Sequence, residues 1–192
     1  ICTNTMHKAL DKVVTGVPQY EIIADIYKNQ INGVNGKYGD YTSLCPLIQV
    51  GKSTSTPHLT WSEEPLPKEG IVVLEIGGAR RHYNAPLTRT AYIGKPPSQI
   101  SKLANTIIEA GNKAFEISKP GTTCEDVESV WQNELNKNGY EKKSRVGYSI
   151  GLNFPPDWGE RTASLRVGDK TILEEGMCFH FQSGVWLENF GA

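Results

Sequence analysis

Residues 71–93 read IVVLEIGGARRHYNAPLTRTAYI, and this stretch decides the class of fold. Residues 71–76 form an almost uninterrupted β-branched apolar run, which predicts a buried strand. A second strand-like stretch ends at Tyr83, and a third covers residues 87–93. Glu75 is the one charged residue of the first run. The segment therefore predicts a β-rich centre that carries an isolated carboxylate.

Helical patterns lie on both sides of this centre. Apolar residues at helical spacing, with glycine or proline at the ends, predict helices over residues 4–14, 21–31, 98–118 and 123–138. Shorter apolar stretches predict further strands over residues 44–50, 146–153 and 177–186. Helices and strands are mixed along the chain and do not alternate, so the predicted class is α+β.

Two parts of the chain resemble each other. Residues 8–23, KALDKVVTGVPQYEII, and residues 112–127, NKAFEISKPGTTCEDV, each contain a helix, a glycine and a glutamate that begins a second helix. A strand ending in glycine follows in both cases, as SLCPLIQVG and SRVGYSIGL. The likeness predicts two related α+β halves with an active site between them. Chance similarity of two helix-turn-helix units is the alternative.

Composition narrows the classes of function. The 192 residues carry a formal net charge of −1, and their Lys and Arg residues are scattered, which argues against nucleic-acid binding. No stretch approaches the ~18 apolar residues of a membrane-spanning helix. Four cysteines lie far apart in contexts that suit buried thiols, which predicts a reducing compartment, the cytoplasm. Because the sequence begins at Ile1 and stops at Ala192 after an apolar segment, we expect a fragment of a longer protein.

Two histidines are candidates for proton transfer. His58 lies in the polar loop STSTPHLTW, where a solvated side chain without function is the alternative. His180 lies in the apolar run MCFHF, and strand alternation points it away from Phe179 and Phe181. A buried, hydrogen-bonded histidine and a catalytic one are both compatible with that position.

Three carboxylates are candidates for a base or a ligand contact. Glu75 interrupts an apolar strand, where a carboxylate is costly unless it is paired or protonated. Its alternative role is an ion pair with one of three nearby arginines, Arg80, Arg81 and Arg89. The loop NFPPDWGERT holds Asp157, Trp158 and Glu160 beside two prolines. Rigid loops with such groups often bind ligands.

The order of several segments resembles the pita-bread hydrolases, the superfamily of methionine aminopeptidase, prolidase and creatinase. The resemblance covers nearly the whole chain, and its segments are the early helix pair, the loop around His58, residues 72–94, GYSIGL and GMCFHFQSG. Residues 55–61, 89–97 and especially 146–171 resemble ectoine hydrolases, which open the ring of a cyclic amidine. The implied fold has two pseudo-symmetric α+β halves around a curved antiparallel sheet. It also implies that residues 1–192 are the catalytic domain, without an N-terminal domain and the last strands.

The resemblance also implies the loss of a metal site. Metallopeptidases of the superfamily hold two metal ions with two Asp, one His and two Glu. Here Glu75 stands at the first Asp, Pro86 at the second, Tyr148 at the His and Gln182 at the first of the two Glu, while the second would lie beyond Ala192. Proline has no ligand atom. We therefore expect no metal and no cofactor, as in creatinase.

Roles for the site residues follow from the same resemblance. His58 matches a position of substrate contact in the peptidases and of proton transfer in creatinase. We expect Glu75 or Glu160 to act as base or nucleophile, His58 as acid and base, and His180 as a second proton carrier or an orienting group. Thr88 stands where creatinase has a carboxylate, so the two mechanisms differ.

Substrate contacts are assigned to aromatic and acidic residues. Tyr83, Tyr148 and Trp158 are expected to surround a small cationic ring, and Asp157 to pair with its charge. The predicted function is metal-independent hydrolysis of a C–N bond in a small cyclic amidine. A metal-dependent Xaa-Pro dipeptidase and a non-catalytic binding module are the alternatives. The expected partners are a small-molecule substrate and a second copy in the full-length protein, with no nucleic acid or membrane.

Overall fold

The computed structural model describes all of residues 1–192, which form two compact units. The first unit comprises Ile1–Pro96, Gly151–Trp158 and Trp186–Gly191. The second comprises Pro97–Ile150 and Gly159–Val185, together with Ala192. Each unit contains two helices and a three-stranded antiparallel sheet, so the predicted α+β class is confirmed. No helix is both long enough and apolar enough to cross a lipid bilayer.

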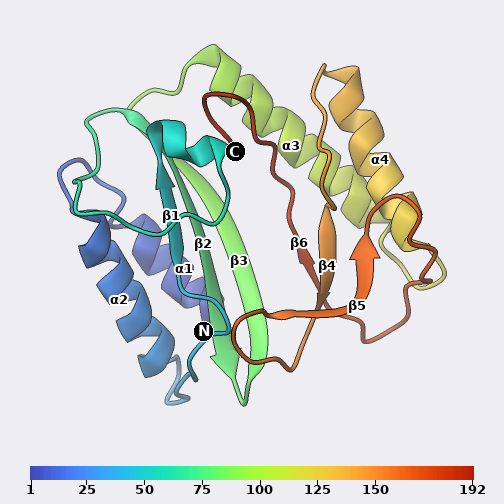
Figure 1. Ribbon diagram of the computed structural model, residues 1–192, viewed down its shortest axis with the longest axis horizontal. Helices are drawn as coiled ribbons and strands as arrows, with labels where there is room; N and C mark the ends of the chain where they lie inside the picture. The colour runs from blue at the N-terminus through green and yellow to red at the C-terminus, as the bar shows by residue number, and fades with distance from the viewer. The chain divides into compact units, whose positions relative to one another are not determined.

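The first unit has its sheet in the strand order β1-β2-β3 (Figure 1). Its strands are β1 (Leu47–Val50), β2 (Gly70–Arg80) and β3 (Tyr83–Ile93). Its helices are α1 (Cys2–Leu10), α2 (Gln19–Asn32) and the short 3-10 helix η1 (Gly51–Ser55). Two expectations need correction here. The strand-like stretches before Tyr83 form one continuous strand, and the first residues of the expected loop STSTPHLTW belong to η1.

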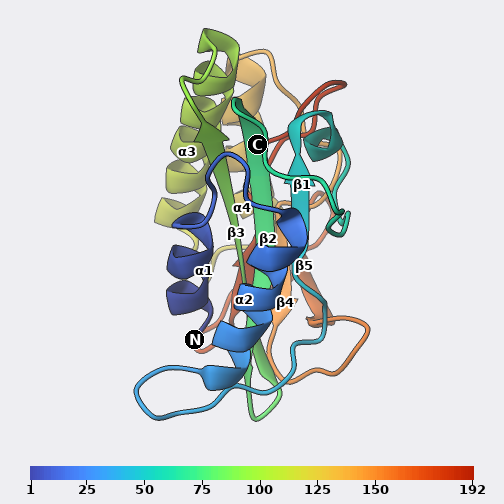
Figure 2. The same cartoon turned by 90° about the vertical axis from the view of Figure 1, so that its left-hand side faces the viewer.

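The core of the first unit lies between α1, α2 and the sheet (Figure 2). Alternate residues of β2, including Leu74 and Ile76, are fully buried against Met6 and Ile22 of the helices. Side chains of a strand point alternately to its two faces, so this burial fixes which face of β2 meets the helices. The intervening residues of β2 therefore point to the opposite face.

The second unit has its sheet in the strand order β5-β4-β6. Its elements are α3 (Ser98–Ile117), α4 (Cys124–Lys137), β4 (Gly147–Ile150), β5 (Gly159–Leu165) and β6 (Phe179–Phe181). Phe181 packs against Phe115 of α3 at 4.4 Å between ring centroids and edge-on against Trp131 of α4 at 6.1 Å. The helices therefore cover the sheet face to which Phe181 points.

Strand β5 corrects an expectation, because it lies where the sequence predicts only a loop. Its residues lack a clear apolar alternation, and tertiary contacts hold them in place. The hydroxyl of Ser149 in β4 accepts hydrogen bonds from the backbone N–H of Thr162 at 3.3 Å and of Ala163 at 3.2 Å. The expected strands 146–153 and 177–186 are shorter in the structure than predicted.

The two units share a hydrogen-bond pattern at their helix connections. Gly16 and Gly121 both have positive φ, +86° and +96°, which glycine adopts without strain. In the first unit, Gly16 N–H donates to Leu66 O at 2.9 Å, and Leu66 N–H donates to Val17 O at 2.9 Å. In the second unit, Gly121 N–H donates to Leu173 O at 2.9 Å, and Leu173 N–H donates to Thr122 O at 2.8 Å. The same exchange in both units supports a common plan for the two halves over chance similarity.

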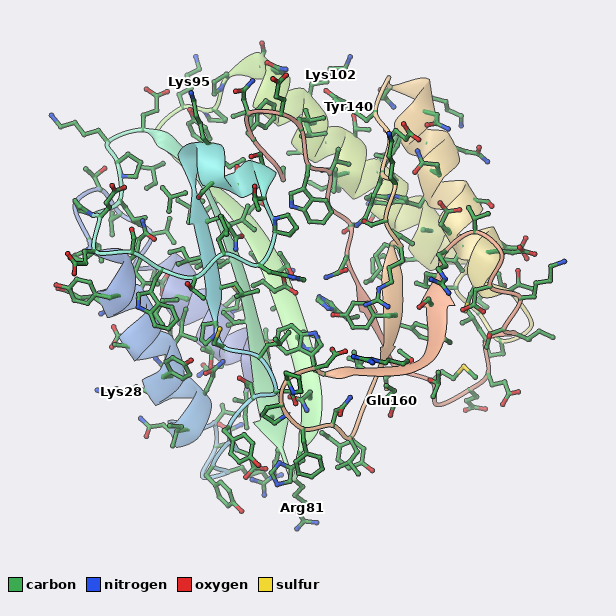
Figure 3. The ribbon with its side chains drawn as sticks, viewed as in Figure 1. Lys28, Arg81, Lys95, Lys102, Tyr140 and Glu160 are labelled. Carbon is green, nitrogen blue, oxygen red and sulfur yellow. The ribbon has the colours of Figure 1, made fainter.

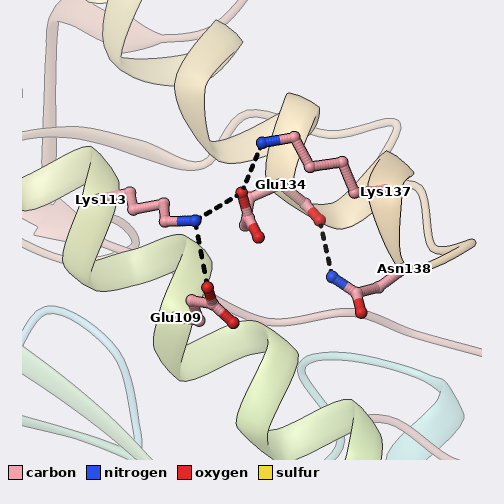
Figure 4. A network of polar contacts seen from close by, with 5 residues as sticks. All are labelled: Glu109, Lys113, Glu134, Lys137 and Asn138. Atoms are coloured by element: carbon pink, nitrogen blue, oxygen red, sulfur yellow. Dashed lines mark hydrogen bonds and ion pairs between the residues drawn. The ribbon is translucent and has the colours of Figure 1, made fainter.

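A buried carboxylate ties α3 to α4 (Figure 4). The Glu134 side chain is 7% exposed and lies 2.8 Å from the Lys113 ammonium and 3.0 Å from that of Lys137. Lys113 also pairs with Glu109 at 3.1 Å. Hydrogen bonds from Lys113 and then Lys137 lower the pKa of Glu134, against the opposing effect of burial. The charged form of Glu134 is therefore the stabilising one.

We expect Glu134→Gln to lower the urea midpoint at neutral pH. The folded-state pKa lies below the unfolded-state value of about 4.3, so the contribution of the carboxylate is present above the unfolded pKa and is lost as pH falls through the folded pKa. The difference from the parent chain should therefore shrink as the pH falls below the unfolded-state pKa and be lost once the pH is below the folded-state pKa. Glu109→Gln, at a carboxylate that is 58% exposed, serves as the control and should change little. An equal drop in the urea midpoint at neutral pH and below the folded-state pKa would contradict this account.

Candidate functional site

Strand β2 carries Glu75 on the sheet face opposite α1 and α2. Leu74 and Ile76 point into the helical core, so Glu75 and Gly77 point the other way. The Glu75 residue is only 8% exposed. The guanidinium of Arg80 lies over Tyr38, 5.3 Å from its ring centroid. A poorly solvated carboxylate, which the sequence predicts, therefore stands on the sheet face opposite the helices.

Trp158 lies on the same face of β2. Its side chain is fully buried, and a Cβ built on Gly77 would lie 3.0 Å from its indole ring. Only glycine allows the ring to approach the strand so closely. Because Gly77 and Glu75 are two residues apart on one strand, the structure brings Trp158 and Glu75 to one face. These two residues of the predicted site therefore share one surface of the first unit.

The register of β2 and β3 tests whether a metal pair fits. Glu75 pairs with Thr88, and Gly77 pairs with Pro86. Positions 75 and 86 are therefore diagonal neighbours on one face, about 7–8 Å apart, which suits two ligands of one metal centre. Pro86 has no ligand atom, and nowhere in the chain do three His, Cys, Asp or Glu side chains form a group that could hold a metal ion. These residues do not fit a two-metal site.

The remaining predicted residues of the first unit are more exposed. His58 lies in the turn after η1 with φ +64°, and its side chain makes no hydrogen bond or ion pair. Tyr83 begins β3 and is 63% exposed. Asp157 is partly buried, and its backbone N–H donates to Phe154 O at 3.4 Å. Their roles in proton transfer and substrate contact stay predictions, as does the position of the site between the two halves.

In the second unit, three side chains form a row across the sheet. Tyr148 of β4 pairs with Ser164 of β5 on one side and with His180 of β6 on the other. Directly paired residues point to the same face, so the row lies opposite Phe181 and the helices. The Tyr148 hydroxyl lies 3.1 Å from His180 Nδ1, and both residues are buried. The structure thus joins two predicted site residues in one hydrogen bond.

Two cations near this row were not singled out by the sequence. Arg145 places its guanidinium carbon 4.0 Å from the centroid of the Tyr148 ring. Lys142 is 6% exposed, and its ammonium donates to the backbone oxygen of Gln182 at 2.5 Å. In the sequence both belong to one short basic cluster with the exposed Lys143. All three residues are cations, so the sequence alone does not show which of them are buried.

Glu160 lies apart from His180. It is exposed at the start of β5 (Figure 3). Glu160 lines a cavity of about 80 Å³ together with Ser149, Thr162, Ala163, Thr171, Met177, Cys178 and Phe179. Ser149 and Phe179 alternate with Tyr148 and His180, so they point to the opposite face. His180 is not among the residues that line the cavity of Glu160.

The cysteines are all free thiols. Burial raises the pKa of Cys2 and that of Cys124 to about 11, so both are protonated and unreactive at neutral pH. Cys178 is exposed, which corrects the expectation that every cysteine is buried. None of the four belongs to the Glu75 face or to the Tyr148 row.

The chain is similar to known proteins both in sequence and in fold. The sequence profile of metallopeptidase family M24 matches residues 1–192. The chain is 38% identical to the ectoine hydrolase of Halomonas elongata over 193 residues, covering 97% of this chain and 48% of that protein. It is 26% identical to the Xaa-Pro dipeptidase of Pyrococcus horikoshii, covering 100% of this chain and 52% of that protein. The chain spans about half the length of the curated relatives it matches.

A solved structure gives the fold. The X-Pro aminopeptidase from Thermotoga maritima superposes with a TM-score of 0.86 at 22% identity, covering 100% of this chain and 53% of that one. At that identity the likeness concerns the fold alone. The predicted pita-bread fold is therefore confirmed.

We expect Gly77→Ala to destabilise the first unit, because the added methyl group would lie 3.0 Å from the Trp158 ring. Overpacking of this kind costs about 1–3 kcal/mol. Gly111→Ala in α3 is the matched control, since its nearest neighbour lies at 3.7 Å. That change should be neutral or stabilise by up to about 1 kcal/mol. Urea unfolding measures both variants, and equal midpoints would contradict the close approach of Trp158.

Proposed function

The chain belongs to metallopeptidase family M24, and we propose that it is the catalytic domain of a metal-independent hydrolase that opens a C–N bond in a small cyclic amidine. The observation that carries the proposal is the replacement of metal-ligating side chains. Pro86 occupies the diagonal partner position of Glu75, and Tyr148 is hydrogen-bonded to His180 at 3.1 Å. The 38% identity to an ectoine hydrolase supports the same substrate class.

The reaction needs a base and an acid. A water molecule loses a proton to the base and adds to the amidine carbon, and the departing nitrogen gains a proton as the C–N bond breaks. Ectoine and water would give N-acetyl-diaminobutyrate in this way, with no redox change. When both ring nitrogens carry a proton, His180 can donate from Nδ1 to the Tyr148 hydroxyl oxygen and give up the proton on Nε2, which leaves a neutral imidazole. His180 is then the proposed proton donor, with His58 as the second candidate.

Glu75 is the better candidate for the base. It is 8% exposed and stands on the face of β2 that also carries Trp158, one of the proposed substrate contacts. Glu160 is exposed and lines the cavity on the face of its sheet opposite His180. Asp157 and the aromatic side chains Tyr83, Tyr148 and Trp158 remain the proposed contacts to the ring.

We expect Glu75→Gln to lower kcat on ectoine by about 10²–10⁴-fold, the range that one positioned acid or base supplies. Glu160→Gln is the matched control on an exposed carboxylate and should stay within about threefold of the parent. The intact protein is incubated with ectoine, and ring-opened product is followed by NMR. A large loss in Glu160→Gln with full activity in Glu75→Gln would reverse the assignment.

A second candidate is a metal-dependent Xaa-Pro dipeptidase, favoured by the likeness to the Pyrococcus horikoshii enzyme. We expect ectoine turnover in the intact protein to persist after treatment with EDTA, and Mn²⁺ or Co²⁺ to produce no dipeptide cleavage, because the ligand positions do not fit a metal pair. Stoichiometric metal binding that switches on cleavage of an Xaa-Pro dipeptide would overturn the metal-independent mechanism.

Ectoine binding without turnover would support a non-catalytic module. Because all four cysteines are free thiols, the cytoplasm remains the proposed location.

A further inference from the structure

We propose that Arg145 forms a subsite for a carboxylate group of the bound ligand, beside the Tyr148 and His180 pair. This inference rests on the proposed function for the identity of the ligand, a small amidine that also bears a carboxylate. The subsite itself is built entirely within the second unit. Arg145 is not among the site residues that the sequence predicts.

The position of Arg145 follows from two contacts on one face of the sheet. Its guanidinium carbon lies 4.0 Å from the centroid of the Tyr148 ring, and its Nη1 lies 3.4 Å from Ser164 Oγ. Ser164 and Tyr148 are direct partners across β5 and β4, and Tyr148 and His180 are direct partners across β4 and β6. Arg145 therefore lies over the same row that carries the proposed proton donor.

The charge of Arg145 has no carboxylate partner within the chain. The ion pairs of the structure join Lys12, Lys113 and Lys137 to acidic residues, and none includes Arg145. Arg145 is nevertheless partly buried. The Tyr148 ring covers one side of the guanidinium, and an anionic group of a ligand would supply the counter-charge that the chain does not.

The geometry of the guanidinium selects the kind of anion. Arginine has five N–H donors in one plane, and stacking on an aromatic face leaves the edge of that plane open. One donor makes the long contact to Ser164, so the others remain for a ligand. Two parallel N–H donors match the two oxygens of a carboxylate. Because Tyr148 contacts both Arg145 and His180, a carboxylate held here would fix an attached ring beside the proton donor.

A purely structural role is the alternative, in which Arg145 only supports the ring of Tyr148. The two roles differ in what they predict for ligands. A structural brace would affect charged and neutral ligands equally, whereas a carboxylate subsite distinguishes a carboxylate from its carboxamide.

The first arm of the test uses acetate as a probe and does not depend on turnover. In the intact ¹⁵N-labelled protein, the Nε–Hε signal of Arg145, assigned by its loss in Arg145→Met, should shift saturably with acetate. It should not shift with chloride at equal ionic strength. Lys143→Met removes an exposed positive charge two residues away and should leave the titration unchanged. An Arg145 signal that ignores acetate would overturn the subsite, whatever the enzyme does with ectoine.

The second arm compares ectoine with its carboxamide. Arg145→Met should raise KM for ectoine by about 10- to 100-fold, the effect of losing hydrogen bonds to a charged group, with little change in kcat. The carboxamide should be a poor substrate for the parent and should lose nothing further in the variant, while Arg145→Lys should recover part of the loss. Equal losses on both ligands would indicate the structural brace and end the proposal. If acetate shifts Arg145 but ectoine is not hydrolysed, the proposed function fails and the subsite stands.

Discussion

The antiparallel pairing of β2 with β3 governs the chemistry of the first unit. Arg81 and His82 form a two-residue turn, both with positive φ, and this turn sets every partner along the two strands. A slip by one residue would turn the side chains of β2 to their opposite faces. Glu75 would then meet the apolar helices, where an unpaired carboxylate costs several kcal/mol. The register that buries the apolar side chains of β2 against the helices therefore also places Glu75 on the opposite face of the sheet.

The same alternation organises the second unit, where it separates two surfaces of different character. The face with Phe181 packs on Trp131 and Phe115, while the opposite face carries the row of Tyr148, His180 and Ser164. In the proposed function, Tyr148 stands where the metallopeptidases have a metal-binding histidine. Its hydroxyl orients an imidazole by a hydrogen bond, where a histidine would bind a cation.

Much of the fold could be predicted because local signals and tertiary structure agree. The helix predicted over residues 98–118 is α3, Ser98–Ile117, and Thr123 caps α4 by accepting from Asp126 N at 3.2 Å. Strand β5 could not be predicted, because its hydrogen bonds to Ser149 come from a residue distant in sequence. In the basic cluster, Lys142 is buried and Lys143 exposed, a difference that only the folded chain creates.

The site shows the same division between local and tertiary information. The strand pattern sufficed to give Glu75 a buried position and His180 a face opposite Phe181, because alternation is a local property of the chain. It could not distinguish Glu75 from Glu160, since both are carboxylates near apolar segments. The structure separates them by solvation: Glu75 is 8% exposed on β2, whereas Glu160 is exposed beside a small cavity. Burial, which the sequence shows least directly, is therefore the observation that favours Glu75 over Glu160 as the proposed base.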